Sequence, residues 1–213
     1  MKRNFFAATT VALAIATLSI ISVPCFALSA HSTSSAVQGV PYTYLGTLYS
    51  VGPTTRDAFA LAVSPYLHGY AEKHNKESCG EIARNADHRY ALVWGTNHSH
   101  VGCIIPLQNV PTGFVPFGAT IHAHPVRNYY YSRIDVRFGV SGGAVGERRG
   151  TFIFDMGADR HFSERDYESG RGYLATPNGA IFQNGSASSV AKITVAPCAV
   201  VLRQRTSHYL ASL

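Results

Sequence analysis

Several patterns that mark other classes of protein are missing from this 213-residue sequence, and each absence narrows what the chain can be. It has four cysteines but no Cys-x-x-Cys pair, so a zinc site built from cysteines is not expected. The His-x-Glu and Pro-Cys-x-x-Cys patterns of zinc nucleobase deaminases are absent as well. Beyond residue 23 no apolar run is long enough to span a bilayer, and no internal repeat is present.

The N-terminus has the pattern of a secretory signal peptide. Lys2 and Arg3 precede an apolar run over residues 5–23, and Ala27 is a small residue suited to cleavage. We therefore predict that residues 1–27 are removed and that the mature protein is exported, to a periplasmic or extracellular location. An uncleaved membrane anchor is the alternative, but the run is near the lower limit for a bilayer span.

The charge balance gives little support to nucleic-acid binding. The chain carries 18 basic and 12 acidic residues, a formal charge of +6 that falls to +4 once Lys2 and Arg3 are removed. Such a weak excess is typical of a soluble surface. Tyrosines at 129–131 lie between arginines, but export argues against a nucleic-acid partner. The oligomeric state cannot be predicted from these features.

Three cysteines remain after removal of the leader: Cys79, Cys103 and Cys198. In an oxidising compartment one pair can form a disulfide, and one thiol is left over. Cys79 and Cys103 lie in segments expected to form neighbouring strands, so this pairing is favoured.

The mature chain is long enough for one domain with a sizeable core. Ser-rich sequence predicts a flexible lead-in over residues 28–53, followed by a domain over residues 54–213. The domain begins with a predicted helix over 54–75, capped by Thr54 or Thr55 and interrupted at Pro65. Predicted strands follow at 77–84, 89–94, 100–105, 117–124, 131–140, 151–155, 172–176, 180–183 and 191–202, with a Gly-rich hairpin at 139–150. The expected class is α/β, with a mixed, largely antiparallel sheet and few flanking helices.

A His-Ala-His-Pro sequence ends the predicted strand at 117–124. Because side chains alternate along a strand, His122 and His124 point the same way. Two imidazoles and one carboxylate make a three-ligand zinc set whose fourth position stays open, the arrangement of catalytic zinc. With ten histidines in the chain a chance His-x-His is common, and a second occurs at His98 and His100.

Further residues of the right chemistry lie on both sides of the histidine pair. Upstream, Glu77 opens an apolar segment that contains a glycine three residues later, and this carboxylate can act as a general base. Downstream, Ser163 is a predicted helix N-cap with Asp166 at the third helical position. The sequence from Gly172 to Gly179 then predicts a short strand that enters a turn.

This series of motifs resembles the JAMM metallopeptidase domain, also called JAB or MPN, and in particular its bacterial secreted or toxin-type branch. The resemblance covers roughly residues 55–185 and consists of a Glu-x-x-Gly context, His-x-His-Pro and Ser-x-x-Asp in that order. It implies a deaminase-like fold and a Zn²⁺ ion bound by His122, His124 and Asp166. It also implies that Glu77 activates water and that Ser163 stabilises the oxyanion.

The sequence offers an alternative to Asp166 as the metal ligand and an alternative to Glu77 as the base. Ser132 and Asp135 form a second Ser-x-x-Asp, closer to the histidines in sequence, whereas Asp166 follows a helix cap and precedes a segment typical of toxin-type members. The alternation of apolar residues over 131–140 predicts a strand, in which Asp135 would form a solvated ion pair. Asp166 is therefore preferred, with an insertion between residues 129 and 159. Glu81 is the alternative to Glu77.

The predicted activity is hydrolysis of a peptide or isopeptide amide bond in a peptide or protein substrate, and cell-wall peptide is one candidate. Two alternatives remain: a non-catalytic exported JAMM-like binding domain, and a metal-binding protein in which His98, His100, His122 and His124 together hold copper or zinc.

Overall fold

The computed structural model describes residues 40–106, 109–138, 144–147 and 161–204, all within one compact unit that spans residues 33–213. The predicted signal peptide, the strand at 151–155 and most of the Gly-rich hairpin lie outside these ranges. Within them, eight strands form one sheet in the order β7-β6-β5-β4-β2-β3-β1-β8. The strands are β1 (Thr43–Ser50), β2 (Ser78–Arg84), β3 (Tyr90–Thr96), β4 (Val115–Ala123), β5 (Gly172–Thr176), β6 (Gly179–Gln183), β7 (Ala191–Lys192) and β8 (Val200–Arg203).

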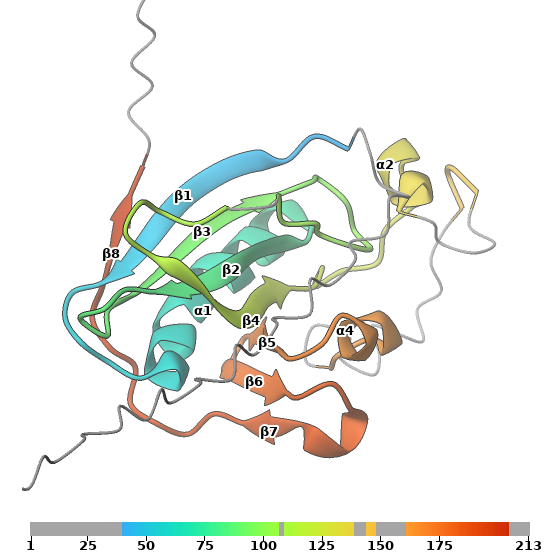
Figure 1. Cartoon of the computed structure of the whole chain (residues 1–213). Coiled ribbons are helices and arrows are strands. Elements are labelled where there is room, and N and C mark those ends of the chain that lie inside the picture. Colours follow the sequence, from blue (N-terminus) through green and yellow to red (C-terminus); the bar gives the residue numbers. More distant parts are fainter. Residues whose placement is uncertain (1–39, 107–108, 139–143, 148–160, 205–213) are drawn as a thin grey trace, which may run out of the picture. The chain divides into compact units, whose positions relative to one another are not determined.

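The sheet is mixed, as predicted. In the described part of the chain β4 and β5 pair in parallel, and the six other strand pairs are antiparallel. Three α-helices accompany the strands there: α1 (Arg56–His74), α2 (Arg133–Arg137) and α4 (Glu164–Glu168). A 3-10 turn, η3, spans Ala187–Ser189. The α/β class and the small number of helices are therefore confirmed (Figure 1).

The long helix α1 covers one face of the sheet (Figure 1). Thr55 caps its first turn by accepting a hydrogen bond from the Ala58 N–H, and Asn75 ends it in the left-handed conformation. The predicted interruption at Pro65 is wrong, because the helix continues through this residue. One backbone hydrogen bond is lost there, but apolar residues on both sides of the proline hold the helix against the sheet: Phe59, Ala60, Val63, Leu67 and Ala71.

The core lies between α1 and the central strands. The fully buried side chains of Ile82, Leu92, Ile121 and Tyr173 reach it from β2, β3, β4 and β5. Ser78 also faces the helix, since its hydroxyl donates to the Leu67 carbonyl. Neighbouring residues on a strand point to opposite faces, so the residues between these core positions lie on the face that α1 leaves uncovered.

Four other predictions about elements were wrong. The lead-in does not extend over 28–53, because residues 43–50 form β1, in which Leu48 and Ser50 are fully buried. Residues 100–105 form a loop rather than a strand, and residues 133–137 form α2 rather than part of a strand. The predicted strand at 191–202 is split into β7 and β8. The predicted N-cap at Ser163 and the strand from residue 172 are confirmed.

Candidate metal centre

His122 near the end of β4, His124 directly after this strand and Asp166 of α4 meet at one end of the sheet. His122 Nε2 lies 3.1 Å from His124 Nε2 and 3.1 Å from Asp166 Oδ1, and His124 Nε2 lies 3.3 Å from Asp166 Oδ2. The side chains are 11 to 18 % exposed. Among the residues that the structure describes, this is the one group of three or more His, Cys, Asp or Glu side chains close enough to hold a metal ion.

Strand pairing explains why both imidazoles point to this site. Ala123 pairs with Ser78 and is buried in the core under α1, so His122 and His124 project from the opposite face. His122 also pairs with Leu174 of β5, which brings the segment that follows α4 against the histidine strand. The alternation predicted from the sequence is therefore present.

The short helix α4 fixes the carboxylate. Asp166 is the third residue of α4, and its Oδ2 accepts hydrogen bonds from the Ser163 backbone N–H at 2.6 Å and the Ser163 hydroxyl at 2.7 Å. Burial by itself would raise the pKa of Asp166, but the charges and hydrogen bonds of His122 and His124 outweigh it. The pKa of this carboxyl is consequently held well below its usual range, and the group is ionised.

These donors suit a small divalent cation such as zinc. Two ligands at 2.0–2.1 Å from a tetrahedral ion lie roughly 3.3 to 3.4 Å apart. The observed separations of 3.1, 3.1 and 3.3 Å between the three donor pairs are close to this value. Two imidazole nitrogens with one carboxylate also match the ligand set of catalytic zinc sites. The residues present therefore fit such an ion.

Glu77 lies beside the histidines, directly before β2. The β2 and β4 register, continued by one residue pair, places Glu77 opposite His124 and on the same face of the sheet. Its side chain lies in a buried position, and its backbone is held on both sides. The Glu77 N–H donates to the Ser99 carbonyl at 2.8 Å, and the Thr96 hydroxyl donates to the Glu77 carbonyl at 2.6 Å.

Glu81 shares the face of Glu77 but is farther from the histidines. It pairs with Thr120, two residues before His122. Burial raises the pKa of the Glu81 carboxyl. The register therefore places Glu77 nearer to the centre than Glu81.

Asp135 does not belong to the group of His122, His124 and Asp166, which is called the metal-ligand group below. The environment predicted for Asp135 was also wrong. It lies in α2, and its side chain is 0 % exposed, so it is not a solvated carboxylate on a strand. Its partners are Ser132, Ser99 and His100; the distance from its Oδ2 to His100 Nδ1 is 2.7 Å. The structure thus joins the second Ser-x-x-Asp to a histidine of the second His-x-His.

Sequence reasoning missed this second cluster, although both motifs that form it were visible. The His100 ring stacks on Tyr129, with ring centroids 4.3 Å apart and an angle of 4° between the planes. Lys76 Nζ lies 2.8 Å from His100 Nε2. Burial lowers the pKa of Lys76, although the charge of Asp135 acts in the opposite direction.

The four-histidine metal site does not form. His98 Nε2 lies 2.9 Å from the Thr43 hydroxyl, and His100 is engaged with Asp135 and Lys76. Neither belongs to the group made by His122, His124 and Asp166.

The disulfide predicted between Cys79 and Cys103 is confirmed. Cys79 pairs with His122 across the β2 and β4 ladder, so the disulfide lies on the face that carries the metal-ligand group. It attaches the loop after β3 to the start of β2. Cys198 forms no disulfide.

Comparisons with known proteins identify no relative: no family model, no curated protein and no solved structure matches the chain. Within the described residues, no helix combines the length and the apolar character needed to cross a membrane. The function is therefore inferred from the chemistry of the site itself.

Proposed function

We propose that this protein is a zinc-dependent hydrolase that cleaves a peptide or isopeptide amide bond. The observation that carries the proposal is the convergence of His122, His124 and Asp166, with donor separations that suit a tetrahedral ion. When bound there, zinc would lower the pKa of a coordinated water to about 7 and so supply hydroxide at neutral pH.

The protein's own groups would move the protons. Glu77 is the proposed general base: its carboxylate accepts a proton and passes it to the leaving amine. Its buried position opposite His124 supports this role. Glu81 is the less favoured base, because its register position is farther from the histidines.

The Ser163 hydroxyl can donate its hydrogen bond either to Asp166 or to the substrate, but not to both at once. Its single hydroxyl proton is donated to Asp166 in the structure, which orients the ligand carboxylate. Donation to the oxyanion of the substrate would require the hydroxyl to turn away from Asp166. We propose that it does so as negative charge develops on the substrate.

The order of the motifs supports a JAMM-like fold as part of the proposal. The glutamate precedes one inner strand, the histidines end its neighbour, and Ser163 and Asp166 cap a helix before the next strand of the same mixed sheet. The signal-peptide pattern and the Cys79–Cys103 disulfide support an exported enzyme. We propose cell-wall peptide as the first substrate class to examine.

The first test is the zinc content of the chain without residues 1–27, measured by elemental mass spectrometry. We expect one zinc per chain in the wild type and a loss of at least ten-fold in affinity in His122→Ala and Asp166→Ala, because each removes a ligand. Asp135→Ala should keep its zinc wherever it remains folded. Absence of zinc from the well-folded wild type, even after metal is supplied, would refute the proposal and favour a non-catalytic binding domain.

The second test concerns turnover. Glu77→Gln should retain zinc but lose about 100-fold or more in kcat, because an amide cannot accept the proton. Glu72→Gln, at an exposed position on α1, is the matched control. Hydrolysis is followed on purified cell-wall fragments and on quenched fluorescent peptides, with mass spectrometry to identify new ends. Full activity in Glu77→Gln would disprove the assigned base.

A further inference from the structure

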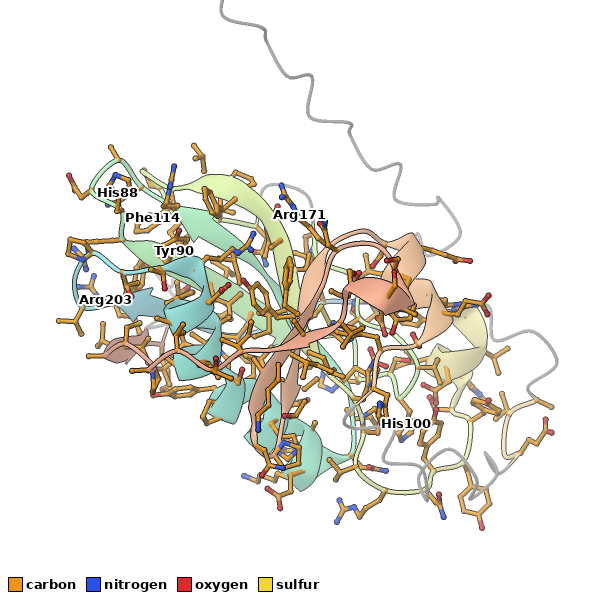
Figure 2. The ribbon with its side chains drawn as sticks, turned by 90° about the horizontal axis from the view of Figure 1, so that it is seen from below. His88, Tyr90, His100, Phe114, Arg171 and Arg203 are labelled. Atoms are coloured by element: carbon orange, nitrogen blue, oxygen red, sulfur yellow. A yellow bond between two sulfur atoms is a disulfide. The ribbon has the colours of Figure 1, made fainter. Side chains whose placement is uncertain are left out.

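A second cluster of ionisable side chains lies beside the metal-ligand group without belonging to it. It joins Asp135 of α2 to residues 97–103, here called the base-holding loop, which follows β3 and ends at the disulfide. Figure 2 shows His100, from this loop, far from His88, which lies in the turn between β2 and β3. The loop is therefore at the end of the sheet where Glu77 lies.

We propose that Asp135 and His100 are positioning residues for Glu77. The inference rests on the proposed function, because Glu77 matters in this way only if it acts as the base. Neither residue belongs to the group formed by His122, His124 and Asp166; both act on Glu77 through the base-holding loop.

The buried carboxylate of Asp135 organises the loop through several hydrogen bonds. Oδ1 accepts from the Ser99 hydroxyl at 2.8 Å and from the His100 backbone N–H at 2.6 Å. Oδ2 accepts from His100 Nδ1 at 2.7 Å and from the Ser132 backbone and hydroxyl, both at 2.7 Å. Such charge-assisted bonds are roughly twice as strong as neutral ones, so the carboxylate fixes Ser99 and His100 firmly.

Ser99 transmits this order to the proposed base. Its carbonyl accepts the Glu77 backbone hydrogen bond, while its hydroxyl donates to Asp135 and accepts from the Val101 N–H at 3.0 Å. On the other side of the peptide, Thr96 holds the Glu77 carbonyl. The backbone of Glu77 is therefore clamped between the end of β3 and the loop that Asp135 organises.

His100 holds the residue next to the base. Asp135 Oδ2 accepts from His100 Nδ1, and Lys76 Nζ lies 2.8 Å from His100 Nε2 and 3.0 Å from Nδ1, so the imidazole is held between a carboxylate and an ammonium group. Stacking on Tyr129 fixes the plane of the ring. Lys76 and Glu77 are consecutive, and so are the two loop residues that hold them: His100 contacts the Lys76 side chain, and Ser99 accepts from the Glu77 N–H. A geometry this constrained suits a base, since a small misplacement of a catalytic group can reduce the rate about 100-fold.

The experiment compares two serine variants that each remove one hydroxyl bond to Asp135. Ser99→Ala removes the hydroxyl bond that joins the base-holding loop to Asp135. Ser132→Ala removes a hydroxyl bond to Asp135 within α2 and its N-cap, and leaves the bonds to the loop in place. Hydrogen exchange of the Glu77 amide should accelerate about ten-fold or more in Ser99→Ala and much less in Ser132→Ala. For a quenched fluorescent peptide that the wild type hydrolyses, kcat should fall by a similar factor in Ser99→Ala, with KM and zinc content unchanged.

Asp135→Asn should accelerate hydrogen exchange of the Glu77 amide and lower kcat more than Ser99→Ala does. Asp87→Asn, at an exposed position, is its control. Wild-type kcat in a folded Ser99→Ala protein, or equal effects of the two serine variants on Glu77, would overturn the inference. A wild-type protein that binds zinc but has no turnover would overturn the proposed function, and this inference with it. If the wild type hydrolyses the peptide but the Glu77 amide exchanges no faster in Ser99→Ala, only the positioning role is overturned.

Discussion

At the residue scale, the two Ser-x-x-Asp sequences show what local chemistry can and cannot predict. Both form the same structure, with a serine at the helix N-cap and an aspartate that accepts its backbone N–H. At Asp166 the cap was recognised from the sequence. At Asp135 the alternation of Ile134, Val136 and Phe138 favoured a strand, although the cap signal was equally present. Five residues are too few for periodicity to distinguish a strand from one turn of helix.

The partners of the two aspartates could not be predicted from either motif. Asp166 meets the two histidines at the end of β4, and Asp135 meets a histidine of the loop after β3. Sequence distance favoured Asp135 as the partner of His124, but the folded chain brings the more distant carboxylate to the histidines. Long-range pairing of this kind depends on strand order, and no local pattern encodes strand order.

Asp135 also predicts how stability changes in acid. Burial opposes ionisation, but the hydrogen bonds from His100 and Ser132 hold the pKa of Asp135 well below its usual range. A carboxylate whose pKa is lower in the folded state stabilises fully above the unfolded pKa of about 3.9, and this contribution is lost as pH falls toward the folded pKa. Wild type should therefore lose more stability than Asp135→Asn between pH 6 and pH 3.

Urea denaturation at several pH values measures this difference. Other acidic groups, Asp166 included, are common to both proteins and cancel in the comparison. His100 and Lys76 face the Asp135 carboxylate, and both residues are retained in the variant. If the free energy of unfolding changes with pH in the same way in wild type and Asp135→Asn, the Asp135 carboxylate is not the cause of the loss of stability in acid.

At the element scale, the helix with a clear N-cap sequence was predicted correctly, whereas elements without a distinct start or end in the sequence were not. The helix predicted over 54–75 is α1, and of the two threonines that the sequence offers as its cap, Thr55 is the one that accepts the hydrogen bond. Strand β1 was missed because a Ser-rich segment precedes it, although its buried residues belong to the core. The expected strand at 100–105 was wrong, because the disulfide and Asp135 hold that segment as a loop.

The cap of α1 gives a quantitative prediction. Thr55→Ala removes the acceptor of the Ala58 N–H, whose distance to the threonine hydroxyl is 3.2 Å. We expect the free energy of unfolding to fall by about 1 kcal/mol. Thr112→Ala, at an exposed loop position, serves as the control and should change it by less than about 0.5 kcal/mol. Chemical denaturation checks both values, and equal stability of Thr55→Ala and wild type would contradict the assigned cap.

At the scale of the whole molecule, the disulfide connects the sheet to the base-holding loop. The two cysteines are 24 residues apart, so their bond should stabilise the fold by about 3.5 kcal/mol through loss of entropy in the unfolded chain. Reduction of the metal-free protein, or replacement of Cys79 and Cys103 by serine, should lower the free energy of unfolding by roughly this amount.

Denaturation with and without a phosphine reductant measures the effect. Cys198→Ser is the control, because Cys198 forms no disulfide and its replacement should leave the response to reductant intact. Equal stability of the oxidised and reduced proteins would show that the bond adds nothing to the fold.

The parallel contact between β4 and β5 bears on when the proposed ion would be acquired. His122 and His124 lie at the end of the strand before this crossover, and Asp166 belongs to the short helix that precedes β5. Until the crossover closes, the chain offers two imidazoles and no carboxylate, so tight binding of an ion would wait for this long-range pairing, which is a slow kind of folding step. If the polypeptide is exported unfolded, it would leave the cytoplasm without metal. The supply of metal at its destination would then decide which ion the proposed site takes up.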